Sequence, residues 1–211
     1  MKGIMLNERF GLETATLNGS KTRTSRDELS RKKKHTEEEL EFIYLLNDED
    51  YMKSSGTLSF DGINTFNLDD CCNHYDFKTK YKVGEIVAVK QRYKDIFSLG
   101  WNSDLTGDEA GWRNKMFVKN ELMPHQTQIT DIKLERLQDI SNEDCMKEGI
   151  LIGDFINTWN KYYYDIIGDC AAHKTFKTPQ EAFASLIDKI SGKGTWDRNE
   201  YNVVYYYKVV K

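Results

Sequence analysis

The stretch that decides the fold of this chain lies near its beginning and reads Gly19-Ser20-Lys21-Thr22-Arg23-Thr24-Ser25-Arg26. It contains three cationic side chains, four hydroxyl side chains and no large apolar residue. A strand that buries one face normally alternates apolar and polar residues, and this stretch does not. It therefore forms either a solvated strand or the lining of a wet pocket that holds a polar or anionic ligand.

Together with the two residues before it, this stretch resembles the pattern L-x-G-x-K-T-x-T-x-R near the N-terminus of ASCH domains, which are small barrels similar to the PUA fold. Three later segments resemble further ASCH patterns in the family's order, and they are residues 81–89, 132–150 and 183–210. The last is similar to the closing segment of longer, phage-type members. The four segments cover about half the chain, and four matches in the family's order are more specific than any single match.

The resemblance implies an α+β fold, a PUA-like mixed β-barrel with short helices, formed by a single domain over residues 1–211. The sequence places strands at about 3–6, 20–26, 85–93, 128–137 and 201–210, with helices between them. Two segments, at about 27–78 and 95–120, have no counterparts in the family. We interpret them as insertions that lie together on one rim of the barrel. The basic block at 31–34 in the first insertion is predicted to be exposed, because a run of like charges is costly to bury.

Bulk composition excludes several classes of protein. A chain of 211 residues is long enough for one good core. Its net charge of −4 argues against a protein that coats nucleic acid by charge alone. No apolar run approaches the roughly 18 residues that a membrane span requires, and no secretory signal is present. We therefore expect a soluble, cytoplasmic protein without membrane contacts, and the sequence does not indicate an oligomeric state.

The cysteines do not indicate a metal site or a disulfide framework. Cys71 and Cys72 are adjacent, and neither they nor Cys170 belong to a paired C-x-x-C motif. Nearby histidines, His74 and His173, do not complete a recognised zinc spacing. Reduced thiols, no metal and no cofactor are the expectation.

A short helix before Gly149 carries the second candidate feature. Ser141 is a good N-cap with Asp144 at the third helical position, which makes Glu148 the last helical residue. A carboxylate is unfavourable at a helix C-terminus, and a local conflict of this kind is typical of functional positions. The alternative is a solvent-facing glutamate. From sequence alone, Glu148→Gln is expected to leave stability unchanged or slightly improved.

One bacterial branch of ASCH proteins hydrolyses N4-acetylcytidine to cytidine and acetate, and its catalytic Lys, Thr and Glu match Lys21, Thr24 and Glu148. The resemblance implies that Thr24 is the nucleophile, Lys21 the proton acceptor and Glu148 the proton donor. A lysine acts as a base near neutral pH only when its pKa is lowered, and Arg23 and Arg26 are close enough to do this. Because side chains alternate in a strand, Lys21 and Thr24 converge only if the backbone bends between them.

The alternative is a non-catalytic module that binds RNA or a nucleotide. In either case Thr22, Arg23, Arg26 and Gln91 are the candidate substrate-binding residues, and a nucleoside or RNA is the expected ligand. Gln91 stands where relatives carry the Glu of V-x-E-x-W, and His125 stands where M-P-R has Arg. These two departures weaken any proton transfer or phosphate contact at those positions.

Overall fold

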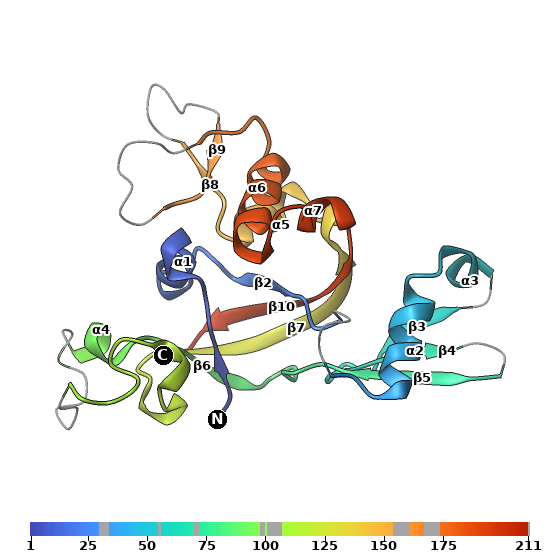
Figure 1. Cartoon of the computed structure of the whole chain (residues 1–211), viewed down its shortest axis with the longest axis horizontal. Coiled ribbons are helices and arrows are strands. Elements are labelled where there is room, and N and C mark those ends of the chain that lie inside the picture. Colours follow the sequence, from blue (N-terminus) through green and yellow to red (C-terminus); the bar gives the residue numbers. More distant parts are fainter. Residues whose placement is uncertain are drawn as a thin grey trace.

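The computed structural model describes residues 1–29, 34–54, 56–69, 72–97, 100, 107–153, 161–166 and 174–210. Short helices pack around three β-sheets, so the predicted α+β class is confirmed. Figure 1 shows the largest sheet as a curved layer in the middle of the molecule. Within the described part of the chain, no helix is both long and apolar enough to cross a membrane.

The central sheet has five strands in the order β1-β6-β7-β10-β2. Their bounds are β1 Gly3–Ile4, β6 Ile86–Val89, β7 Gln126–Arg136, β10 Tyr201–Val209 and β2 Arg23–Arg26. β1 runs parallel to β6, and the other pairs are antiparallel. β1 and β2 form the two edges, so the described strands make an open sheet rather than a closed barrel.

A β-bulge keeps the two longest strands facing the core. Tyr206 of β10 pairs with Asp131 of β7, but the next residue, Tyr207, pairs with Ile129. The extra residue on β7 shifts the order in which its side chains alternate between the two faces of the sheet. Ile129 and Ile132 are therefore both buried although they are three positions apart. Tyr205 and Tyr207 are buried as well, and both belong to the main core.

The first insertion forms its own small layer. Helices α2 (Glu37–Leu46) and α3 (Glu49–Ser54) precede an antiparallel sheet of β3 (Thr57–Phe60), β4 (Thr65–Asp69) and β5 (His74–Lys78). Phe42 of α2 stacks on Phe77 of β5 with ring centroids 5.6 Å apart, and both rings belong to the main core cluster. Lys34 is exposed as predicted, whereas residues 31–33 of the basic block lie outside the described residues.

The expectation that both insertions lie on one rim is wrong. Figure 1 shows β3–β5 and α2 at one end of the long axis, and α4 (Tyr93–Phe97) at the other. The first insertion leaves the end of β2 and returns at the start of β6. The second leaves the end of β6 and returns at the start of β7. Since the insertions adjoin opposite ends of β6, they project from opposite ends of the sheet.

The remaining helices gather on one side of the sheet, near β2 and β10 (Figure 1). They are α1 (Leu12–Leu17), α5 (Asn142–Lys147), α6 (Pro179–Ser191) and α7 (Thr195–Arg198). Short 3-10 turns occur at Glu8–Phe10, Lys115–Phe117, Asn120–Leu122 and Leu137–Asp139, and β8 (Leu151–Ile152) pairs with β9 (Tyr162–Tyr163). Gln180 Nε2 donates to the Ile140 carbonyl at 2.7 Å, which ties α6 to the turn before α5.

Candidate active site

Lys21 lies in the turn that joins α1 to β2 and is 1% exposed. Its Nζ donates to the Arg23 carbonyl at 2.6 Å, to the Glu148 carbonyl at 2.8 Å and to Glu148 Oε2 at 2.6 Å. Three acceptors use all three N–H groups of an ammonium. The structure therefore holds Lys21 in its charged form.

Glu148 is the C-cap residue of α5, one position beyond the last helical residue, and Gly149 with φ of 104° turns the chain away. Its carboxylate accepts hydrogen bonds from Lys21 Nζ, from Arg23 Nη1 at 2.9 Å and from Ser25 Oγ at 2.7 Å. The residue is 5% exposed, so the solvent-facing alternative is wrong. Two cations and a hydroxyl compensate its unfavourable position at the helix end.

Burial and neighbouring charges shift the pKa values of both Lys21 and Glu148. Burial lowers the pKa of Lys21 below its ordinary value; Glu148 opposes that shift, while Arg26 and Arg23 add to it. Burial by itself would raise the pKa of Glu148, but Lys21, Arg23 and the hydrogen bonds from Lys21 and Ser25 hold it below its ordinary value. The effect of Arg23 and Arg26 on Lys21 is in the direction expected from the sequence.

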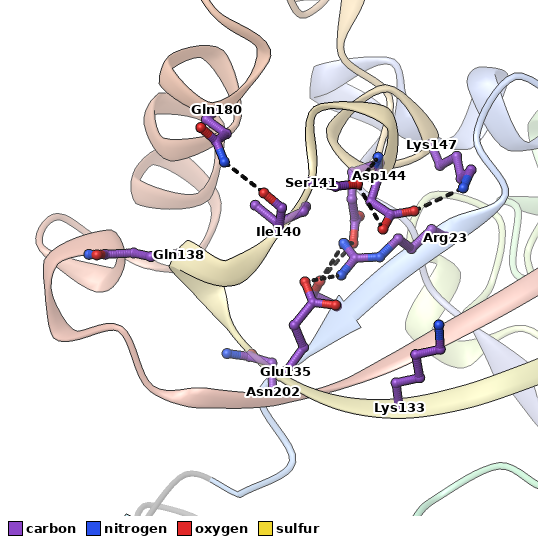
Figure 2. Close-up of polar contacts among 12 residues, drawn as sticks. Arg23, Lys133, Glu135, Gln138, Ile140, Ser141, Asp144, Lys147, Gln180 and Asn202 are labelled. Atoms are coloured by element: carbon purple, nitrogen blue, oxygen red, sulfur yellow. Dashed lines mark hydrogen bonds and ion pairs between the residues drawn. The ribbon is translucent and has the colours of Figure 1, made fainter. Parts of the chain in front are cut away.

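Arg23 holds this pair in place from the first position of β2. Its Nη2 donates to Glu135 Oε1 at 2.8 Å, a contact that Figure 2 shows, and its Nη1 donates to Glu148 Oε1. Arg23 is 1% exposed, and its guanidinium lies 5.7 Å from the ring centre of Tyr206. Because both Nη groups are directed at protein carboxylates, we do not place Arg23 among the substrate-binding residues of the proposed site.

Thr24 and Ser25 have different surroundings although they are neighbours. β2 begins at Arg23, so Lys21 and Thr22 precede the regular strand, and Lys21 and Thr24 nevertheless line the same cavity, which is described below. Ser25 Oγ is bound to Glu148. Among the described residues, none forms a hydrogen bond with the Thr24 side chain, which is therefore available to a ligand.

A cavity of about 570 Å³ brings these residues together. Lys21, Thr24, Ser25, Arg26 and Glu148 all line it. Helix α6 contributes an apolar wall, and the second insertion contributes a polar segment that ends in Met116. These two groups are Phe183, Leu186, Ile187 and Ile190 from the helix, and Arg113, Asn114, Lys115 and Met116 from the insertion.

Of the predicted binding residues, Thr22 and Gln91, like Arg23, do not line this cavity. Thr22 acts through its backbone, with its N–H donating to the Lys147 carbonyl at 3.1 Å. Gln91 is 4% exposed and shares a 2.8 Å hydrogen bond with His125, and neither residue is among the described residues that line the cavity. The two departures from the family pattern therefore contact each other, and a Gln–His pair stands where the pattern has Glu and Arg. We leave Gln91 and Thr22 out of the proposed binding site.

The sequence did not indicate that Glu135 is a partner of Arg23, nor that Ser25 Oγ donates a hydrogen bond to Glu148. Glu135 lies in the segment that resembles the family pattern, but nothing in its spacing indicates that it faces Arg23. In the described part of the chain, no group of three or more His, Cys, Asp or Glu side chains is arranged to hold a metal ion. Cys71, Cys170 and His173 lie outside that part, whereas Cys72 is exposed and Cys145 is buried.

No family model matches this chain, and no curated protein or solved structure is significantly similar to it. The resemblance to ASCH domains therefore stays a prediction from the sequence. What the site can do is argued below from its own geometry together with that resemblance.

Acid is expected to destabilise the fold through Glu148. Its folded-state pKa is lower than its ordinary value, so its stabilising contribution is complete above the unfolded carboxyl pKa of about 4.3. That contribution is lost as the pH falls further, through the folded pKa. Urea unfolding between pH 3 and pH 7 should give a steeper loss of stability for wild type than for Glu148→Gln. The exposed Glu143→Gln is the control, and equal pH dependence in all three proteins would contradict the assignment.

Proposed function

We propose that this protein is an ASCH-type, PUA-like protein whose cavity binds a cytosine nucleoside and hydrolyses its N4-acyl group. N4-acetylcytidine would give cytidine and acetate. The observation that carries the proposal is that Lys21, Thr24 and Glu148 line one cavity, although Glu148 is far from the other two in sequence. The cavity volume of about 570 Å³ lies within the range of small-molecule sites. The apolar wall from α6 suits one face of a base, and the polar side suits its edge.

In this reaction the Thr24 hydroxyl oxygen attacks the acyl carbon and its proton passes to Lys21. The bond from the acyl carbon to N4 then breaks, and the leaving amine takes a proton from Glu148. Water hydrolyses the resulting Thr24 ester, which releases the carboxylic acid and restores the hydroxyl. Among the described residues the Thr24 hydroxyl has no hydrogen-bond partner, Lys21 included, so the reaction also requires that this hydroxyl and Lys21 Nζ come within hydrogen-bond reach when the ligand binds.

The charge state of the ion pair fits this chemistry once the cavity is closed by a ligand. The structure holds an ammonium and a carboxylate, which are the wrong forms for a base and an acid. Lys21 Nζ and Glu148 Oε2 are 2.6 Å apart, and one proton transfer between them produces a neutral amine and a carboxylic acid. Excluding water disfavours charged groups, so a bound ligand shifts the pair towards this neutral form.

A non-catalytic pocket is the second candidate, and the charged ion pair favours it. With Lys21 fully bonded and Glu148 accepting from three donors, the resting site lacks both a free base and an acid. Such a site could still accept a hydrogen bond from an exocyclic amine at the carboxylate, as glutamate does with cytosine N4. It would bind a base or nucleotide without turnover.

Incubation with N4-acetylcytidine separates the two candidates. Hydrolysis predicts cytidine release that hardly changes with salt, because the substrate is neutral. A binding module predicts no release, but an affinity for single-stranded RNA that falls with salt, with a slope of about −0.7 per phosphate contact. Cytidine release measured by chromatography, beside RNA affinity at two salt concentrations, decides between them. A protein that neither releases cytidine nor binds RNA would contradict both candidate functions.

A further inference from the structure

A second cavity of about 620 Å³ adjoins the candidate active site. The two cavities share Met5, Arg26 and Asp27 as lining residues. Arg26 Nη2 donates to the Met5 carbonyl at 2.6 Å, so this contact forms the junction between them. The two cavities are therefore adjacent, and Arg26 lines both of them.

The second cavity is rich in cations, although the whole chain carries a net charge of −4. Its lining includes five cationic residues against three acidic ones. The cations are Arg26, Lys34, Lys78, Lys80 and Lys90, and none of them forms an ion pair with a described residue. Two of the three acidic side chains already accept hydrogen bonds from other groups of the protein. Glu28 accepts from the Tyr205 hydroxyl and the Lys80 N–H, and Glu39 caps the backbone N–H of Thr36.

The fold brings these cations together from separate elements. Arg26 ends β2, Lys78 ends β5 and Lys90 directly follows β6. The side chain of Lys90 passes over Gly3, where an added Cβ would lie 2.8 Å from Lys90 Cε. At the junction, Arg26 Nε is buried without a partner among the described residues. The first insertion supplies Lys34 and Lys78, so part of the cationic surface belongs to this insertion.

We propose that the second cavity is a phosphate subsite, and that the ligand of the first cavity is a phosphorylated nucleoside. The inference rests on the proposed function, because it places the base in the first cavity and the phosphate across Arg26 in the second. Lysines and an arginine that have no carboxylate partner among the described residues, placed in a concave surface, are the groups that bind phosphate through charge-assisted hydrogen bonds. The phosphate belongs either to a mononucleotide or to a nucleotide within a strand.

The test compares three ligands by titration calorimetry: cytidine, cytidine 5′-monophosphate and a short single-stranded oligocytidylate RNA. Both phosphorylated ligands are expected to bind about tenfold tighter than cytidine, which corresponds to at least one charge-assisted hydrogen bond. Lys78→Ala/Lys80→Ala should abolish that gain and leave cytidine affinity unchanged. The matched control is Lys133→Ala/Lys208→Ala, which removes two exposed lysines outside both cavities and should keep the gain.

Three results would overturn the phosphate subsite: no gain from phosphate, a gain that survives in the Lys78/Lys80 variant, or an equal loss in the control variant. Tighter binding of the oligonucleotide than of the monophosphate, with a steeper salt dependence, identifies a strand as the source of the phosphate. Hydrolysis of N4-acetylcytidine is measured separately on wild type. Hydrolysis without a phosphate gain refutes this subsite alone, whereas a gain without hydrolysis refutes only the hydrolytic part of the proposed function.

Discussion

Thr24→Val is expected to lower cytidine release from N4-acetylcytidine by about 10⁴-fold or more, which is the scale of losing a catalytic nucleophile. Valine keeps the shape of threonine and removes only the hydroxyl. Because the Thr24 side chain has no hydrogen-bond partner among the described residues, its removal should leave the melting temperature nearly unchanged. Single-turnover assays with wild type and variant, beside thermal melts, measure both expectations.

Ser25→Ala is the matched control, because it removes the neighbouring hydroxyl. Ser25 Oγ donates to Glu148, so its loss is expected to cost about 1–3 kcal/mol of stability and to reduce turnover less than Thr24→Val does. The opposite pattern, with turnover lost in Ser25→Ala and kept in Thr24→Val, would move the nucleophile to Ser25. Unchanged turnover in both variants would refute hydroxyl catalysis in this cavity.

Glu148→Gln is expected to reduce hydrolysis by roughly 10²–10⁴-fold, the usual contribution of general acid–base catalysis. It is also expected to destabilise the fold by about 3–5 kcal/mol, as the breaking of a buried ion pair does. Glutamine keeps a carbonyl but no negative charge, which leaves Lys21 without its ion-pair partner and Arg23 with Glu135 alone. Chemical denaturation and cytidine release, measured on the same preparations, give both values.

The stability part of this result reverses the expectation from sequence. A carboxylate at a helix end looks dispensable when its partners are unknown, and the structure supplies Lys21, Arg23 and Ser25 as partners. Glu143→Gln, an exposed change in the same helix, should alter neither property by a comparable amount. A Glu148→Gln protein as stable as wild type would mean that the buried ion pair contributes little. Normal turnover in that protein would refute the catalytic role.

Local patterns in the sequence were sufficient to predict several elements correctly. The α+β class follows from the order of strand and helix patterns. The helix before Gly149 was predicted to within one residue, since Ser141 Oγ accepts from the Asp144 N–H at 3.1 Å as the capping pattern requires. These features depend on neighbours within a few residues, which a single sequence does contain.

Features that depend on long-range register could not be predicted in this way. Which hydroxyl reaches Glu148, and whether Arg23 meets Glu135, depend on how β2 and β7 are placed beside β10. The pairing of Gln91 with His125 is of the same kind, because two departures from a pattern give no sign that they touch. The positions of the insertions required knowledge of which end of β6 each one leaves.

The place of β10 in the central sheet has a consequence for how the molecule folds. β10 lies between β7 and β2, and Arg23 near the start of the chain pairs with Tyr206 near the end of the described residues. Such non-local pairing raises the contact order, and the entropy of closing a long loop has to be offset before β2 gains its partner. Helices α5 and α6 depend mainly on local contacts and can form earlier. Since β2 carries Arg23, Thr24 and Ser25, we expect the candidate site to be completed late in folding.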